Sequence, residues 1–147
     1  MIVTYPNKIL REKSKPVSAE LIKSEEIKKL IANMKEWVGK ADGVGLAAVQ
    51  IGVLKRVIII EMNGKIQAFI NPKITKHSWK KTALEEGCLS VPGKNGYVKR
   101  SEKISVKALD ENGKKIKLKT SGLISIIFQH EVDHLNGILF IDKIWKK

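Results

Sequence analysis

Two stretches of the chain space their hydrophobic residues as an α-helix does. After a candidate N-cap at Ser24, apolar residues recur every three or four positions over 27–38, and Gly39 follows as a natural stop. The second stretch, from residue 122 to about 135, is apolar on nearly every side. The first pattern predicts an amphipathic N-terminal helix with one face on the core, and the second predicts a buried helix.

Short apolar runs, several of them alternating with polar residues, predict strands over 57–60, 66–70, 82–86, 104–108 and 116–118. The Asn63-Gly64 pair predicts a tight hairpin turn, and Pro72 predicts the end of the strand that follows it. Together the elements predict an α+β fold in a single domain over 1–147, with antiparallel strands and hairpins packed around a buried central helix.

Charge and cysteine content narrow the protein class. The net charge is +13, and 25 of the 28 basic residues are Lys. Because Lys reads bases poorly and the lysines are scattered along the chain, a solvated surface is favoured over sequence-specific nucleic-acid binding. With a single cysteine and no apolar segment resembling a signal peptide or a membrane span, we expect a bacterial-type cytoplasmic protein without contact to a membrane.

The second predicted helix carries the segment HEVDH at 130–134. His130 and His134 stand at i and i+4, on one helix face, so both imidazoles can reach one metal ion. Glu131 is adjacent and can address a water molecule without being a ligand. The alternative is a pair of histidines without a metal, but a buried helix tolerates two His and an acid only where something satisfies them.

Two further segments carry candidate chemistry. Cys88, in EGCLS at 86–90, is either a small buried hydrophobe or the third ligand that HExxH alone does not supply. In GVGLAAVQ at 43–50, Gln50 is either a packing residue after a tight turn or an amide donor to an oxyanion. Spacing alone leaves both alternatives open.

Together these three segments resemble the peptide deformylase family. That family has GxGxAAxQ, EGCLS and HExDH motifs in this order, and the sequence holds all three complete at 43–50, 86–90 and 130–134. The resemblance covers most of the chain. It implies a metal-dependent hydrolase that removes the N-formyl group from the initiator formyl-methionine of nascent polypeptides and releases formate.

The resemblance also implies roles for individual residues. Cys88, His130 and His134 match the ligands of one divalent metal ion, natively Fe(II), with Zn, Ni or Co as alternatives in a purified sample. Glu131 matches the general acid/base.

Other matched positions concern the substrate. Gln50 and the backbone N–H of Leu89 match the donors to the formyl oxygen. Substrate contacts are implied for Val44, Gly45, Leu84, Glu86, Gly87, Ile126 and Ile127. Arg100, paired with Glu86, is expected to hold the cysteine loop behind the ligands.

Two other functions compete with this one. A different HExxH peptidase would bring its third ligand from a downstream His or Glu, but Asp142 is the only acid or His after the motif. A non-catalytic RNA- or ribosome-binding protein would be expected to have lost catalytic residues, and every one is present. As partners we expect N-formylmethionyl nascent peptides and a weak electrostatic association with the ribosome.

Overall fold

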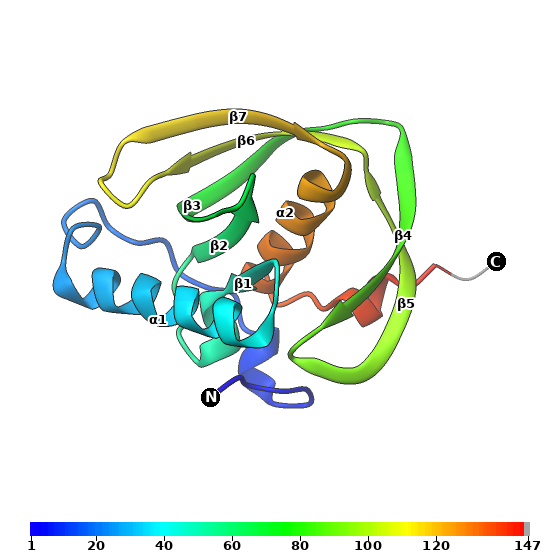
Figure 1. The fold of residues 1–147 in the computed structure, drawn as a ribbon, viewed down its shortest axis with the longest axis horizontal. Helices are drawn as coiled ribbons and strands as arrows, with labels where there is room; N and C mark the ends of the chain where they lie inside the picture. Colours follow the sequence, from blue (N-terminus) through cyan, green and yellow to red (C-terminus); the bar gives the residue numbers. More distant parts are fainter. Residues whose placement is uncertain (146–147) are drawn as a thin grey trace.

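The computed structural model describes residues 1–145 and contains two α-helices and seven strands (Figure 1). The helices are α1 (Glu25–Ala41) and α2 (Gly122–Leu135). The strands are β1 (Gly45–Ala47), β2 (Val57–Met62), β3 (Lys65–His77), β4 (Lys81–Cys88), β5 (Val91–Ser101), β6 (Lys103–Leu109) and β7 (Lys115–Ser121). Short 3-10 helices cover Lys8–Arg11, Ala48–Ile51 and Phe140–Lys143.

Five strands form one antiparallel sheet in the order β1-β2-β3-β6-β7, and β4 pairs with β5 in a separate two-stranded ribbon. The α+β fold with antiparallel strands is therefore confirmed. Within residues 1–145, no helix combines the length and the apolar character needed to cross a membrane.

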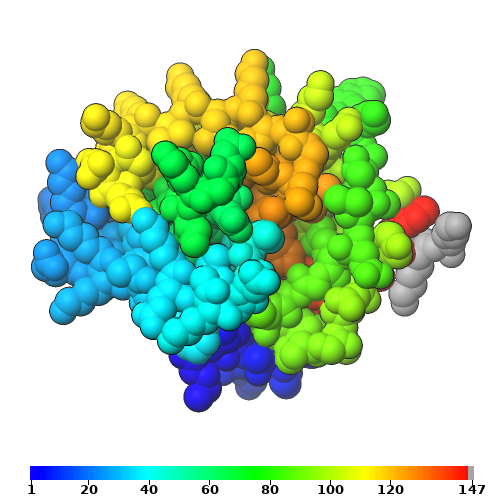
Figure 2. Space-filling view, viewed as in Figure 1, coloured from blue at the N-terminus to red at the C-terminus, as the bar shows by residue number. Residues whose placement is uncertain are grey.

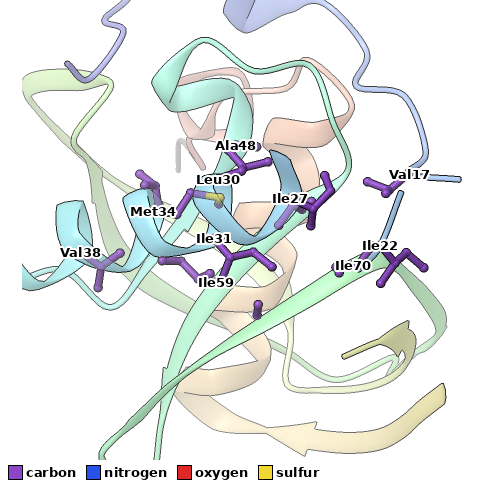
Figure 3. Close-up of a cluster of buried hydrophobic side chains, with 13 residues drawn as sticks. Val17, Ile22, Ile27, Leu30, Ile31, Met34, Val38, Ala48, Ile59 and Ile70 are labelled. Atoms are coloured by element: carbon purple, nitrogen blue, oxygen red, sulfur yellow. The ribbon is translucent and has the colours of Figure 1, made fainter. Parts of the chain in front are cut away.

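The helix α1 packs on one face of the sheet, over β1 and β2. Ser24 caps its first turn, with its side chain accepting from the Ile27 N–H. Side chains from successive turns of α1 point toward Ile59 and Ile70 of the strands (Figure 3). The helical spacing of these apolar residues thus builds the first hydrophobic cluster, and burying it stabilises this half of the fold.

The helix α2, orange in Figure 1, lies against the opposite face of the sheet and also contacts β5. Phe128 is fully buried and packs edge-on against Phe69 of β3, with ring centroids 4.8 Å apart. Because α2 sits between the five-stranded sheet and the β4–β5 ribbon, it is buried along most of its length.

Two predicted boundaries were wrong. The helix α1 continues through the exposed Gly39 and ends at Ala41, where Asp42 adopts a left-handed conformation (φ 53°). One helical glycine costs only about 1 kcal/mol, and Asp is among the few residues that tolerate this conformation. The strand β3 also continues past Pro72 to His77, because the pairing with β6 is irregular between Ile70 and Lys73 and requires no amide donor from Pro72.

Candidate functional site

Three side chains of metal-ligating types converge from two elements. Cys88 ends β4, while His130 and His134 stand one turn apart on α2. Their donor atoms all lie within 4.8 Å of one another, and Cys88 Sγ is 3.3 Å from His134 Nε2. One thiolate and two imidazoles form a donor set that suits Zn or Fe(II), so this cluster could hold a metal ion.

Polar contacts fix α2 against the end of β5. The Gln129 side chain accepts from the Ser101 N–H (3.1 Å) and donates to the Ser101 carbonyl (2.8 Å). Ser125 Oγ donates to the same carbonyl at 3.0 Å. All three residues are buried, where unpaired polar groups are costly, so these bonds set the register of α2 and hence the position of His130.

A buried ion network lies behind His130. Arg100 donates to both carboxylate oxygens of Glu86, at 2.6 and 3.0 Å, and to Asp133 at 2.8 Å. Glu86 Oε1 in turn lies 2.8 Å from His130 Nδ1. Arg100 therefore orients Glu86, and Glu86 holds one ring nitrogen of His130, which leaves the other nitrogen free to bind a metal.

The electrostatics separate the two histidines. Burial disfavours the charged form of His130, but its contacts with Cys88 and Glu86 outweigh that and raise its pKa to about 10. Burial and the positive charge of His130 hold the pKa of His134 well below its usual value. His134 is therefore neutral, the form that binds metals, and a metal at His130 would replace a proton.

Glu131 is buried beside the cluster, with 5% of its surface exposed. Its Oε1 has no hydrogen-bond partner within residues 1–145, and burial raises the pKa of the carboxyl to about 7. The backbone of Gly45 approaches so closely that an added Cβ would lie 2.8 Å from Glu131 Oε2. A carboxyl poised near neutral pH in such a site can accept and return protons.

Gln50 is held with its amide nitrogen toward Cys88. Its Oε1 accepts from the Ala47 N–H at 2.9 Å, while Nε2 lies 3.1 Å from Ser90 Oγ and 3.5 Å from Cys88 Sγ. Gln50 is 2% exposed and belongs to the 3-10 helix Ala48–Ile51 that follows β1. The side chain therefore presents donor hydrogens to the cluster of Cys88, His130 and His134.

A cavity of about 480 Å³ opens onto these groups. In Figure 2, orange atoms of α2 lie in a hollow between the cyan segment around β1 and the green β4. The sequence-predicted site residues that line the cavity are Val44, Gly45, Gln50, Leu84, Glu86, Gly87, Cys88, Leu89, Ile126, Ile127, His130 and Glu131. His134 and Arg100 lie behind this wall, each at most 3% exposed.

Several side chains at the site were not predicted from the sequence, and three of them show why. Asp133 pairs with Arg100, Ser90 pairs with Gln50, and the exposed Leu123 lines the cavity. Asp133 lies inside HEVDH and Ser90 lies inside EGCLS, so their place in these motifs could have indicated that they belong to the site. Leu123 has no such signal, because only the packing of α2 brings its first turn to the cavity.

Comparisons with known proteins agree on one family. The family model for polypeptide deformylase matches residues 1–147. A peptide deformylase of Thermodesulfovibrio yellowstonii is 46% identical over 97% of this chain and 87% of its own length. The crystal structure of peptide deformylase from Thermotoga maritima superposes with a TM-score of 0.94 at 37% identity, covering 99% of this chain and 97% of that one. A class I type b peptide deformylase from Acinetobacter baumannii, bound to Met-Ala-Ser, gives 0.94 at 37% identity, over 98% and 97%.

Proposed function

The chain belongs to the peptide deformylase family, and we propose that it hydrolyses the N-formyl group of formyl-methionine at the start of nascent peptides, releasing formate. The family consists of hydrolases acting on N-formyl peptides. The observation that carries the proposal is the convergence of Cys88, His130 and His134 next to the buried carboxyl of Glu131, at one end of a largely apolar cavity. Nascent peptides are made in the cytoplasm, which is where we expect the reaction.

Cys88, His130 and His134 would hold one divalent metal ion, Fe(II) in the cell and Zn, Ni or Co in some preparations. The fit is chemical: a thiol at the cavity wall and a buried neutral imidazole present soft donor atoms at short mutual distances. When bound, such an ion lowers the pKa of a water molecule, so that hydroxide is available near neutral pH.

Glu131 moves the protons. Its raised pKa, about 7, matches the pH at which it has to accept a proton from the attacking water. The same carboxylic acid can then donate that proton to the nitrogen of the leaving amine. Burial excludes bulk water from Glu131 and its neighbours, so the proton stays with the reacting groups.

Gln50 and the backbone N–H of Leu89 stabilise the negative charge that develops on the formyl oxygen during attack. Two hydrogen-bonded neighbours, Ala47 and Ser90, fix the amide of Gln50 before substrate arrives. Because the donor is already oriented, no reorganisation is needed at the moment of reaction.

The methionine side chain fits between apolar groups of the cavity. Val44, Leu84, Ile126 and Ile127 supply this surface, and Gly87 and Glu86 form part of the wall beside Cys88. Beside Gly43 and Gly45 the peptide backbone can lie along β1 as an added strand. The Met-Ala-Ser bound to the Acinetobacter baumannii relative is the peptide that deformylation of formyl-Met-Ala-Ser would leave.

Formate release tests the proposal. The protein is loaded anaerobically with Fe(II) and given formyl-Met-Ala-Ser, with acetyl-Met-Ala-Ser as the matched control for a generic amide hydrolase. We expect formate from the first peptide, no acetate from the second, and loss of turnover after a chelator removes the metal. No formate from the metal-loaded protein, or undiminished turnover without metal, would contradict the proposal.

A further inference from the structure

Seven exposed lysines gather on one face of the five-stranded sheet, which we call the lysine face. They lie on β3, β6 and β7: Lys73, Lys76, Lys103, Lys107, Lys115, Lys117 and Lys119. In Figure 2 long side chains of the yellow and orange segments project from the upper edge of the molecule. Seven of the 25 lysines are therefore concentrated on one face.

Strand register creates this concentration. Lys73 pairs with Lys107, and Lys107 pairs with Lys117, so three lysines stand side by side across three strands. A second row joins Lys76 to Lys119 through Ser105. Because side chains alternate along a strand, the intervening residues of β6 point the other way and are buried.

The lysine face is open. The helix α1 packs over β1 and β2, whereas α2 packs on the opposite face of β6 and β7, through a cluster that includes Ile104 and Val106. The cavity beside α2 therefore lies on the other side of the sheet. A partner on the lysine face would leave the cavity accessible.

Acidic side chains do not neutralise this face. Among residues 1–145, none of its seven lysines forms an ion pair, although six other lysines do. The acids at its borders are engaged elsewhere: Glu102 pairs with Lys80, Glu111 pairs with Lys35, and Asp110 accepts backbone N–H groups in the β6–β7 turn.

Protection of the sheet edge does not account for the pattern. Lysines on the edge strand β7 discourage pairing with another chain. Edge protection gives no reason for Lys73 and Lys107, which lie directly across inner strands where like charges destabilise the sheet. A bound anionic partner would relieve this repulsion between the lysines, which favours binding.

We propose that the lysine face binds the phosphate backbone of double-helical RNA. Lys supplies point charges for phosphates but no bidentate base contacts, and the face has no Arg. Single-stranded RNA is bound mainly by stacking its bases on aromatic side chains, and no Phe, Tyr or Trp lies among the lysine rows. The fully exposed Trp79 lies only at the border of the lysine face. Charges spread over three adjacent strands can reach the phosphates that border the wide, shallow minor groove of an A-form helix. The choice of RNA over DNA rests on the proposed function, because nascent peptides are made on RNA.

The test is binding of a fluorescent 20-base-pair RNA duplex, followed by anisotropy over a range of KCl concentrations. The variant carries Lys107→Gln, Lys117→Gln and Lys119→Gln. The control carries Lys8→Gln, Lys13→Gln and Lys29→Gln, three exposed lysines outside the lysine face, so both proteins lose the same net charge.

We expect the lysine-face variant to bind at least about tenfold more weakly and to lose about 2–3 from the slope of log K against log salt, since each phosphate contact contributes about 0.7–0.9. The control should stay within about twofold of the starting protein. An equal loss in both variants would overturn the proposal, because it would show that net charge alone drives binding.

Two further measurements test the ligand and the location of its binding site. Tighter binding to single-stranded RNA of equal length, or to phosphatidylserine vesicles, than to the duplex would overturn the proposal. NMR shifts of the unmodified protein on adding duplex should map to β3, β6 and β7, and shifts confined elsewhere would also refute it. Both variants should release formate from formyl-Met-Ala-Ser at the starting rate, so this outcome is read independently of the proposed reaction.

Discussion

Replacing Gly45 with alanine is expected to displace Glu131 without disturbing the metal-binding side chains. Gly45 has no left-handed backbone angle, so its conformation accepts an alanine. The added Cβ would lie 2.8 Å from Glu131 Oε2, 3.2 Å from Glu131 Cγ and 3.1 Å from Ile127 Cγ2. A contact under 3.0 Å cannot persist, and Oε2 is the end of a flexible side chain, so the carboxylate has to move.

The size of the effect follows from these distances. Ordinary van der Waals contact begins at 3.4 Å, so Oε2 has to shift by at least about 0.6 Å. A misplacement of about 1 Å can cost 10²-fold in rate, and we therefore expect kcat for formyl-Met-Ala-Ser to fall about 10–100-fold. Overpacking should also cost about 1–3 kcal/mol of unfolding free energy, measurable by denaturant titration.

Gly43→Ala is the matched control, because a Cβ there meets nothing within 4 Å. Metal content, kcat and stability of that variant should stay near those of the starting protein, and metal content should also be unchanged in Gly45→Ala. Equal kcat values for the two variants would refute the reasoning. So would a rise in KM alone, since that would mean that the methyl group blocks the peptide rather than moving Glu131.

Three other outcomes are expected. Cys88→Ser should abolish tight metal binding, measured by elemental analysis, because a neutral hydroxyl replaces a thiolate; full metal occupancy would exclude Cys88 as a ligand. Gln50→Ala should keep the metal but slow formate release about 10²–10³-fold, the usual loss for one oxyanion donor, and an unchanged rate would make Gln50 a packing residue. The hydrogen bond from Arg11 lowers the pKa of Asp142, so this pair should stabilise the fold above pH 4 and lose its effect as pH falls further. Because the pair is partly exposed, Asp142→Asn should cost only about 0.5–1 kcal/mol at pH 7 and progressively less as the pH falls below about 4, and a cost that does not change with pH would contradict this assignment.

Local sequence patterns predicted most helices and strands, because apolar spacing and the N-cap at Ser24 reflect interactions between residues that are close in the sequence. They did not locate the end of α1, since Gly39 is tolerated inside a helix whose packing continues to Ala41. They also missed β5, whose residues include two glycines and alternate poorly. That strand is stabilised by pairing with β4 rather than by its own pattern.

The three motifs predicted which residues form the site, but not the side-chain contacts that hold these residues in position. The contact from Arg100 to Asp133 joins residues 33 positions apart and depends on how α2 docks on β5. The lysine face was invisible for the same reason: Lys73, Lys107 and Lys117 become neighbours only through strand register. Such features depend on tertiary packing, which single-sequence patterns do not carry.

The proposed reaction requires Glu131 to transfer protons while Cys88, His130 and His134 hold the metal. Measuring metal content and formate release on one preparation of Glu131→Gln tests it most directly, since Gln keeps the size of the side chain but cannot accept the proton. We expect unchanged metal content and turnover lower by about 10²–10⁴-fold, the range for general acid–base catalysis. Loss of the metal together with activity would show that Glu131 supports the metal instead, and undiminished formate release would show that it has no part in the reaction.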